Sequence, residues 1–278
     1  ELIEFLDDRF RHPQSTGRLT GASRFFPGLD GMHLPQARRA GATGRARIDA
    51  SDHRTGSAED WVAFLVRADI EIAVMFTTAG LSVGIIQNPD YANAICRAYN
   101  DYVSNNYRKV SDRLHPMALI PMQSVDAAVK ELRRAVVDLG LPGAMLPTRG
   151  LPVNLGHALY WPIYEEAERL ELPLLIHTGN TSPMLRFMAE GFPRPNKLQF
   201  PQNNPYGAGL NQVLYGVSQL FASSAMDDFQ RLKVAVLEIG CDWAPGMVKG
   251  MRARNNNKVD DWLGERFFVI TASDFPPG

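Results

Sequence analysis

The sequence is poor in the features that would assign it to several large classes of protein. Two cysteines, Cys96 and Cys241, are too few among 278 residues for a disulfide framework, so we expect reduced thiols and a cytoplasmic protein. No apolar run approaches the ~18 residues of a membrane span. The formal net charge is −1 and no basic stripe is present, so we expect neither nucleic acid nor a membrane as partner. A glycine-rich phosphate loop is also absent, which argues against a dinucleotide-binding fold.

The chain does have enough apolar residues for a large core, arranged in alternating strands and helices. Hydrophobic residues make up 45% and charged residues 21% of the sequence, as in globular domains. Short apolar runs near residues 72, 118, 145, 175, 235 and 269 predict six strands, with helical patterns between them. This alternation predicts an α/β fold with a parallel sheet. A spacing of ~25–60 residues per unit, with polar residues at the late strand ends, favours a (β/α)8 TIM barrel.

Residues 1–58 do not follow this alternation. They are rich in Gly, Arg, Pro and Ser, and we interpret them as an irregular N-terminal excursion or lid. The excursion would belong to one barrel domain that covers residues 1–278. Its histidines, His12, His33 and His53, are expected to be solvated rather than to bind a metal.

The apolar run that ends at His177 is the centre of the prediction. Leu172-Pro-Leu-Leu-Ile is followed by His177 and then by Thr-Gly-Asn180, a pattern typical of a strand buried on both faces. His177 would then lie at the carboxyl end of the strand, where parallel α/β folds bind ligands and metals. On position alone, a core histidine bound to one backbone carbonyl is an equally good interpretation.

Two carboxylates are placed in the same way as His177. Glu238 follows the apolar run Leu232–Leu237, and Asp274 follows the run that starts at Phe267. In a closed barrel these positions converge on one mouth, where an imidazole and carboxylates suit Zn²⁺, Mn²⁺ or Fe²⁺. Such an ion activates water or polarises a substrate oxygen, and Asp274 could serve as general base. The alternative is that Glu238 and Asp274 only cap loops or pair with arginines.

Three side chains just beyond the predicted ligand strands are expected to contact substrate: Asn180, Arg186 and Trp243. The Arg186 guanidinium could bind a substrate carboxylate in a bidentate manner. The alternatives are that Arg186 is an ordinary surface residue and that Trp243 packs against the rim of the barrel.

Three stretches of the chain carry a resemblance to a known family. They are Leu172-Pro-Leu-Leu-Ile-His-Thr-Gly-Asn180, Phe229-Gln-Arg-Leu-Lys-Val-Ala-Val-Leu-Glu-Ile-Gly-Cys-Asp-Trp243 and Ser273-Asp-Phe-Pro. With these motifs the chain resembles the amidohydrolase-related family, the branch of the amidohydrolase superfamily that includes aminocarboxymuconate-semialdehyde decarboxylase. The resemblance implies a (β/α)8 barrel with one divalent metal ion. It also implies that His177 is the fifth-strand ligand and Asp274 the eighth-strand aspartate.

The sequence departs from the family pattern at several points. The family's first-strand Asp-x-His or His-x-His pair is absent, Glu238 stands where the decarboxylases have a sixth-strand histidine, and the usual Asp-Tyr-Pro-His is Asp274-Phe-Pro-Pro. About 14 residues precede Phe267 after the last predicted helix, whereas one βα unit takes roughly 25–30. We therefore expect the first strand and the seventh βα unit of the barrel to be missing. Residues would be absent from the chain near positions 253–260 and also at both of its ends. The metal would be absent if the first-strand ligands are.

Three functions remain open from the sequence. The leading hypothesis is a metal-dependent hydrolase that cleaves a C–N or C–O bond of a small organic substrate, with Asp274 and Glu238 as catalytic residues. The alternative is a metal-dependent nonoxidative decarboxylase of an aromatic or enoic carboxylic acid; Glu238 in place of a histidine favours hydrolysis. The third is a barrel without metal that serves as a binding or scaffold protein. A small molecule is the expected partner, and a homo-oligomer is left open.

Overall fold

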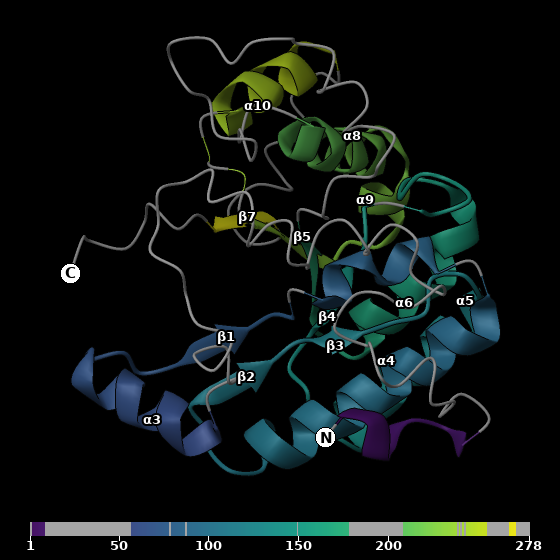
Figure 1. Ribbon diagram of the computed structural model, residues 1–278. Coiled ribbons are helices and arrows are strands. Elements are labelled where there is room, and N and C mark those ends of the chain that lie inside the picture. The colour runs from purple at the N-terminus through teal and green to yellow at the C-terminus, as the bar shows by residue number, and fades with distance from the viewer. Residues whose placement is uncertain are drawn as a thin grey trace, which may run out of the picture.

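The computed structural model describes residues 2–8, 57–77, 79–86, 88–148, 150–177, 208–237, 239, 241, 243–254 and 267–270. Within these ranges, parallel strands alternate with helices, as the sequence predicts (Figure 1). The strands are β1 (Ala73–Met75), β2 (Leu114–Pro116), β3 (Ala118–Leu119), β4 (Ala144–Leu146), β5 (Pro173–His177), β6 (Lys233–Leu237) and β7 (Phe267–Ile270).

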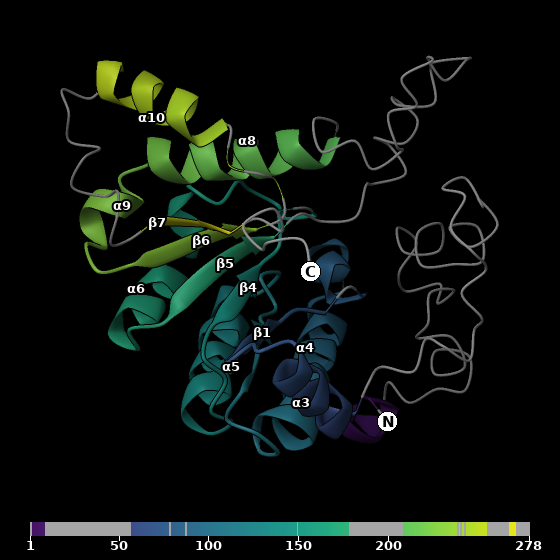
Figure 2. The ribbon, with the colours of Figure 1, turned by 90° about the vertical axis from the view of Figure 1, so that its left-hand side faces the viewer.

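The helices lie between these strands in the chain. The α-helices are α3 (Ala58–Arg67), α4 (Pro89–Val103), α5 (Val125–Val137), α6 (Trp161–Arg169), α8 (Ala208–Ala222), α9 (Ala225–Asp228) and α10 (Trp243–Arg254). Shorter turns of helix are η1 (Leu2–Phe5), η4 (Ala79–Ile85), the π-helical η5 (Ser104–Arg108) and η6 (Ala158–Tyr160). Figure 2 shows α8 and α10 on one side of the set of strands and α4 and α5 on the other.

All strand pairs are parallel, in the orders β1-β2 and β3-β4-β5-β6-β7. The strands β2 and β3 belong to one run that changes its partner at Met117. The Met117 amide donates to the Met75 carbonyl of β1 at 3.0 Å, whereas the Ala118 amide donates to the Gly143 carbonyl beside β4 at 2.8 Å. The seven described strands therefore occupy six positions, which confirms the six predicted strands.

The strands form an arc with the helices on its outer face, and β1 and β7 lie at the two ends of the arc (Figure 1). Parallel strands with helices outside are the arrangement of a (β/α)8 barrel, and the described residues build six of its strand positions. The strand β7 pairs directly with β6 along four residues. The helix α10 lies between these two strands in the chain. Among the described residues no strand lies between β6 and β7, as expected if the seventh βα unit is missing from the chain.

Local sequence signals fix where the helices begin. The Ser57 hydroxyl accepts from the Asp60 amide at 3.2 Å, and the Asp60 carboxylate accepts from the Ser57 amide at 3.1 Å, which forms a capping box before α3. Asn88 caps α4, whose first residue is a proline, and Ser124 caps α5. Each of these polar side chains accepts from a backbone amide that the helix itself cannot bond.

Both cysteines lie within the part of the chain that the structure describes. Cys96 is buried in α4 and Cys241 is exposed, and both are free thiols. Burial raises the pKa of the Cys96 thiol, so it stays protonated and unreactive. Across the described ranges, the helices are all too short or too polar to cross a membrane. Of residues 1–58 the structure describes only 2–8, 57 and 58, so an excursion or lid there stays a prediction.

A buried carboxylate on α6 joins that helix to α5. The Glu166 side chain is 5% exposed and accepts from Arg169 at 2.7 and 2.9 Å and from Arg133 at the same two distances. These hydrogen bonds, from Arg169 first and then Arg133, lower the pKa of Glu166 from 4.5 to about 2. The ion pairs therefore stabilise the fold only while Glu166 is ionised.

This shift predicts how stability falls in acid. A carboxylate with a lowered pKa contributes stability above its unfolded pKa and loses that contribution as the pH falls from about 4.5 towards 2. Replacing Glu166 with Gln should therefore cost about 1–2 kcal/mol at pH 7, because both arginines are more than half exposed and solvent screens them. Urea unfolding should show that this difference shrinks by pH 3. The exposed Glu165→Gln on the same helix is the control, and a difference that does not change with pH would contradict the prediction.

Candidate active site

His177 is the last residue of β5, at the carboxyl end of the sheet. In the strand register, His177 pairs with Leu237, the last residue of β6, and Leu237 pairs with Ile270, the last residue of β7. Three neighbouring strands therefore end at the same level. The His177 side chain is 5% exposed, and its ring lies 5.5 Å from the Phe76 ring, centroid to centroid. The prediction that His177 lies at the end of a buried strand is confirmed.

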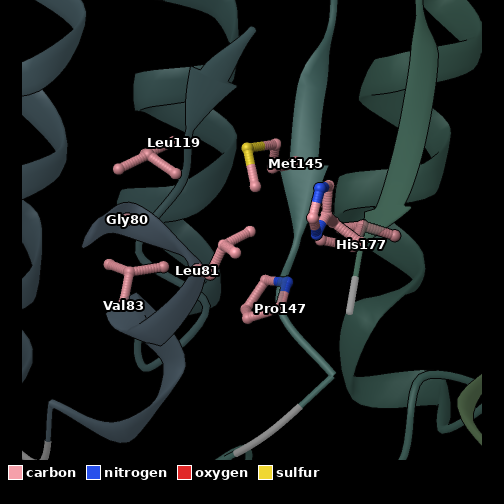
Figure 3. Close-up of a pocket in the computed structure, with 8 residues that line it drawn as sticks. Gly80, Leu81, Val83, Leu119, Met145, Pro147 and His177 are labelled. Carbon is pink, nitrogen blue, oxygen red and sulfur yellow. The ribbon is translucent and has the colours of Figure 1, made fainter. Parts of the chain in front are cut away.

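The His177 imidazole contributes to a small pocket at these strand ends (Figure 3). The pocket is small: the space that no atom fills between its walls is about 200 Å³, and that figure includes open solvent. The lining comes from η4, β3, β4 and the end of β5: Gly80, Leu81, Val83, Leu119, Met145, Leu146, Pro147 and His177. In Figure 3, Leu119 and Val83 lie on one side, the His177 ring lies on the other, and Met145 and Leu81 lie between them.

The pocket wall formed by η4 is held at both of its ends. The Thr77 hydroxyl accepts from the Gly80 amide at 3.2 Å, at the start of η4. The Gln123 amide donates to the Val83 and Ile86 carbonyls at 2.7 and 2.9 Å, at its end. These bonds satisfy backbone groups that a short 3-10 helix leaves open. In the sequence this wall has one signal, the residues Thr77-Thr-Ala-Gly80, which follow the apolar run of β1 directly.

Of the other predicted site residues, the structure describes only Trp243. Asn180, Arg186, Glu238 and Asp274 lie outside the described residues, so their roles stay predictions. Trp243 is the first residue of α10 and packs half-buried against the hydrophobic core. It is not among the residues that line the pocket beside His177, and its contact with substrate also stays a prediction.

The described residues supply one side chain that suits a metal ion in this pocket. Among the described residues that line the pocket, His177 alone can ionise or ligate a divalent cation through nitrogen or a carboxylate. Within the described parts of the chain, there is no group of three or more His, Cys, Asp or Glu that could hold a metal. His177 therefore fits as one ligand, and a complete site would need ligands from beyond the described ranges.

Comparison with known proteins decides the family. The model of the amidohydrolase family matches residues 32–261, which is most of the chain. The chain belongs to the amidohydrolase family. This match confirms the resemblance inferred from the motifs around His177. It also agrees with the barrel-like arrangement of parallel strands and outer helices described above.

Individual members of the amidohydrolase superfamily are similar over much of the chain. Gamma-resorcylate decarboxylase of Rhodococcus jostii (strain RHA1) is 27% identical over 214 residues, which are 70% of this chain and 63% of that protein. The chain thus spans about three fifths of the length of the curated relatives that it matches first.

Solved structures support the fold assignment. A 2,6-dihydroxybenzoate decarboxylase complexed with 2,6-dihydroxybenzoate has a TM-score of 0.66 at 23% identity, over 85% of this chain and 76% of that one. A dihydroxybenzoic acid decarboxylase from Polaromonas sp. JS666, with bound manganese and the inhibitor 2-nitroresorcinol, has a TM-score of 0.65 at 21% identity, over 86% and 75% of the two chains. At these identities the likeness establishes the shared fold.

Proposed function

We propose that this amidohydrolase-family protein is a metal-dependent nonoxidative decarboxylase of a hydroxylated aromatic acid. The observation that carries the proposal is the similarity to gamma-resorcylate decarboxylase over 70% of the chain. Of the two activities expected from the sequence, this similarity favours the alternative, decarboxylation, over hydrolysis. The side chains that line the pocket at the strand ends are mostly apolar, which suits the face of an aromatic ring.

The reaction breaks the bond between the ring carbon and the carboxylate carbon. Carbon dioxide leaves, the electron pair stays on the ring carbon, and one proton replaces the lost carboxylate. The charged carboxylate thereby becomes neutral carbon dioxide. The apolar walls at Leu81, Leu119 and Met145 disfavour the negative charge of the substrate carboxylate, and they exclude water from the ring. The same walls hold the ring, because they bury apolar surface against it.

His177 would hold the divalent ion at the polar edge of this pocket. Manganese bound there would act as a Lewis acid that orients the carboxylate and a neighbouring hydroxyl of the substrate. Packing against Phe76 fixes the orientation of the imidazole ring.

The proposed roles of the other site residues rest on their places in the sequence. In the sequence, Glu238 comes directly after the last residue of β6, and Asp274 comes four residues after the last residue of β7. We assign Asp274 as a second metal ligand and as the acid that gives the proton to the ring carbon, with Glu238 as the second catalytic carboxylate. Asn180, Arg186 and Trp243 are the proposed substrate contacts, and Arg186 would pair with the carboxylate.

The test is the fate of the carboxylate. Purified protein with manganese is incubated with 2,6-dihydroxybenzoate, and carbon dioxide and resorcinol are measured; equal amounts of both are expected. The isomer 3,5-dihydroxybenzoate is the control substrate and should not react, because its hydroxyls are too far from the carboxylate to share a metal ion with it. Hydrolysis of an amide or lactone without carbon dioxide release from any aryl acid would overturn the proposal.

A further inference from the structure

One wall of the pocket is held by a side chain outside it. Asn100 is fully buried on α4, and its carbonyl oxygen accepts from the Leu119 amide at 2.9 Å. Its amide nitrogen donates to the Leu119 carbonyl, also at 2.9 Å. Asn100 therefore makes both backbone bonds that a neighbouring strand would make at this point, beyond the end of β1 at Met75. The backbone of Leu119, whose side chain lines the pocket, is thus fixed from α4.

The orientation of the Asn100 amide is set by a buried carboxylate. Its nitrogen also donates to Glu131 on α5 at 2.7 Å, and only the nitrogen end of the amide can donate to a carboxylate. Glu131 is 1% exposed and accepts from Arg134 at 2.7 and 2.8 Å and from Arg97 at 3.4 Å. Arg134 in turn donates to Asp101 at 2.6 Å. This network gives Asn100 one orientation, and so gives the Leu119 backbone one position.

The other side of Leu119 faces a glycine that has no room for a side chain. A Cβ atom on Gly80 would lie 2.7 Å from Leu119 Cδ1 and would also overlap the Thr77 methyl group. Real Cβ atoms do not approach other atoms so closely, so a side chain at residue 80 would displace the Leu119 side chain. Because the Leu119 backbone is held by Asn100, that displacement has to be taken up within the pocket.

We propose that Gly80 and Leu119 set the size of ring that the pocket accepts, with Asn100 as the positioning residue that keeps Leu119 in place. The ligand class, a planar dihydroxylated ring, rests on the proposed function; the size filter rests on the contacts of Gly80, Leu119 and Asn100. The absence of a side chain at residue 80 provides the space, and the fixed isobutyl group of Leu119 limits it.

The experiment compares the binding of two ring sizes, using reaction products that cannot turn over. Dissociation constants for resorcinol and for 1,3-dihydroxynaphthalene, which adds a fused ring, are measured by calorimetry with manganese present. Leu119→Ala should shift the affinity ratio towards the larger ring by about tenfold, the scale of small changes in apolar pockets. Gly80→Ala should weaken resorcinol binding by a similar factor. Val137→Ala, an apolar truncation on the exposed face of α5, is the matched control and should leave both constants unchanged.

The positioning role of Asn100 has a separate readout. Asn100→Asp keeps the acceptor for the Leu119 amide but loses the donor and places a second carboxylate beside Glu131. In the folded Asn100→Asp variant, the affinity ratio should shift towards the larger ring. Adding Glu131→Gln places an amide donor opposite the new carboxylate at residue 100, and it should recover part of the preference for the smaller ring. A purely structural role would lower the melting temperature and leave the ratio as it was.

The outcomes for the filter and for the proposed function are distinguishable. A shifted ratio without carbon dioxide release supports the filter and overturns the decarboxylase assignment alone. A Leu119→Ala ratio within twofold of the unsubstituted protein, together with a Gly80→Ala dissociation constant for resorcinol within twofold, would overturn the filter whether or not 2,6-dihydroxybenzoate is decarboxylated. Circular dichroism must show that both variants are folded.

Discussion

Replacing His177 with alanine should lower kcat/KM for 2,6-dihydroxybenzoate by at least about a hundredfold, since loss of a residue that merely supports a metal ligand already costs 10–100-fold. The imidazole is the polar group of an otherwise apolar pocket, and no other described side chain there can replace it. Manganese content, measured by mass spectrometry after dialysis, should fall together with activity. The loss should not be recovered by raising the substrate concentration.

The matched control is His157→Ala. His157 is exposed, and its ring accepts from the Leu159 amide at 3.0 Å, at the start of η6. Activity and manganese content of this variant should equal those of the unsubstituted protein. If His177→Ala instead keeps both activity and metal and loses only thermal stability, then His177 is a core histidine packed on Phe76, and the metal site lies elsewhere.

Glu131→Ala should lower the free energy of unfolding by about 3 kcal/mol, the cost of removing one member of a buried ion pair. The substitution takes away the carboxylate that accepts from Arg134 and from the Asn100 amide, in the interior between α4 and α5. Arg134 would keep its bond to Asp101, whereas the fully buried Asn100 amide would lose this acceptor and could not replace it with water. Urea unfolding at pH 7, followed by circular dichroism, measures the change.

Glu165→Ala is the control for this prediction, because Glu165 is exposed on α6, where substitutions usually change stability by less than about 0.5 kcal/mol. A cost for Glu131→Ala that does not exceed the cost for Glu165→Ala would mean that solvent reaches the network. The tight positioning of Leu119 would then have no energetic basis.

The sequence predicts the barrel elements well, for local reasons. The run that ends at His177 is continuous and apolar because β5 is covered on both faces, and Ser57, Asn88 and Ser124 begin helices because they cap the amides beside them. These signals lie within a few residues of the structure that they specify.

The pocket walls escape prediction because the contacts that form them are distant in sequence. Gln123 reaches back about 40 residues to the Val83 carbonyl, and Asn100 reaches 19 residues forward to Leu119. No periodicity marks either residue, since each is a single polar position within an otherwise ordinary element. The carboxylates Glu238 and Asp274, predicted from position and resemblance, stay predictions because they lie outside the described residues.

The change of partner at Met117 has a consequence for how this protein could diversify. On the side of β1, the Leu119 backbone is bonded to Asn100 of α4, whereas on its other side Leu119 pairs with Met145 of β4. The described residues after Met75 therefore form no strand pairing with Leu119. An insertion after β1 that keeps Val83 and Ile86, which are buried in the core, would therefore change the pocket wall and leave the pairing of β3 with β4 intact. We expect such an insertion to change which ligand the pocket prefers.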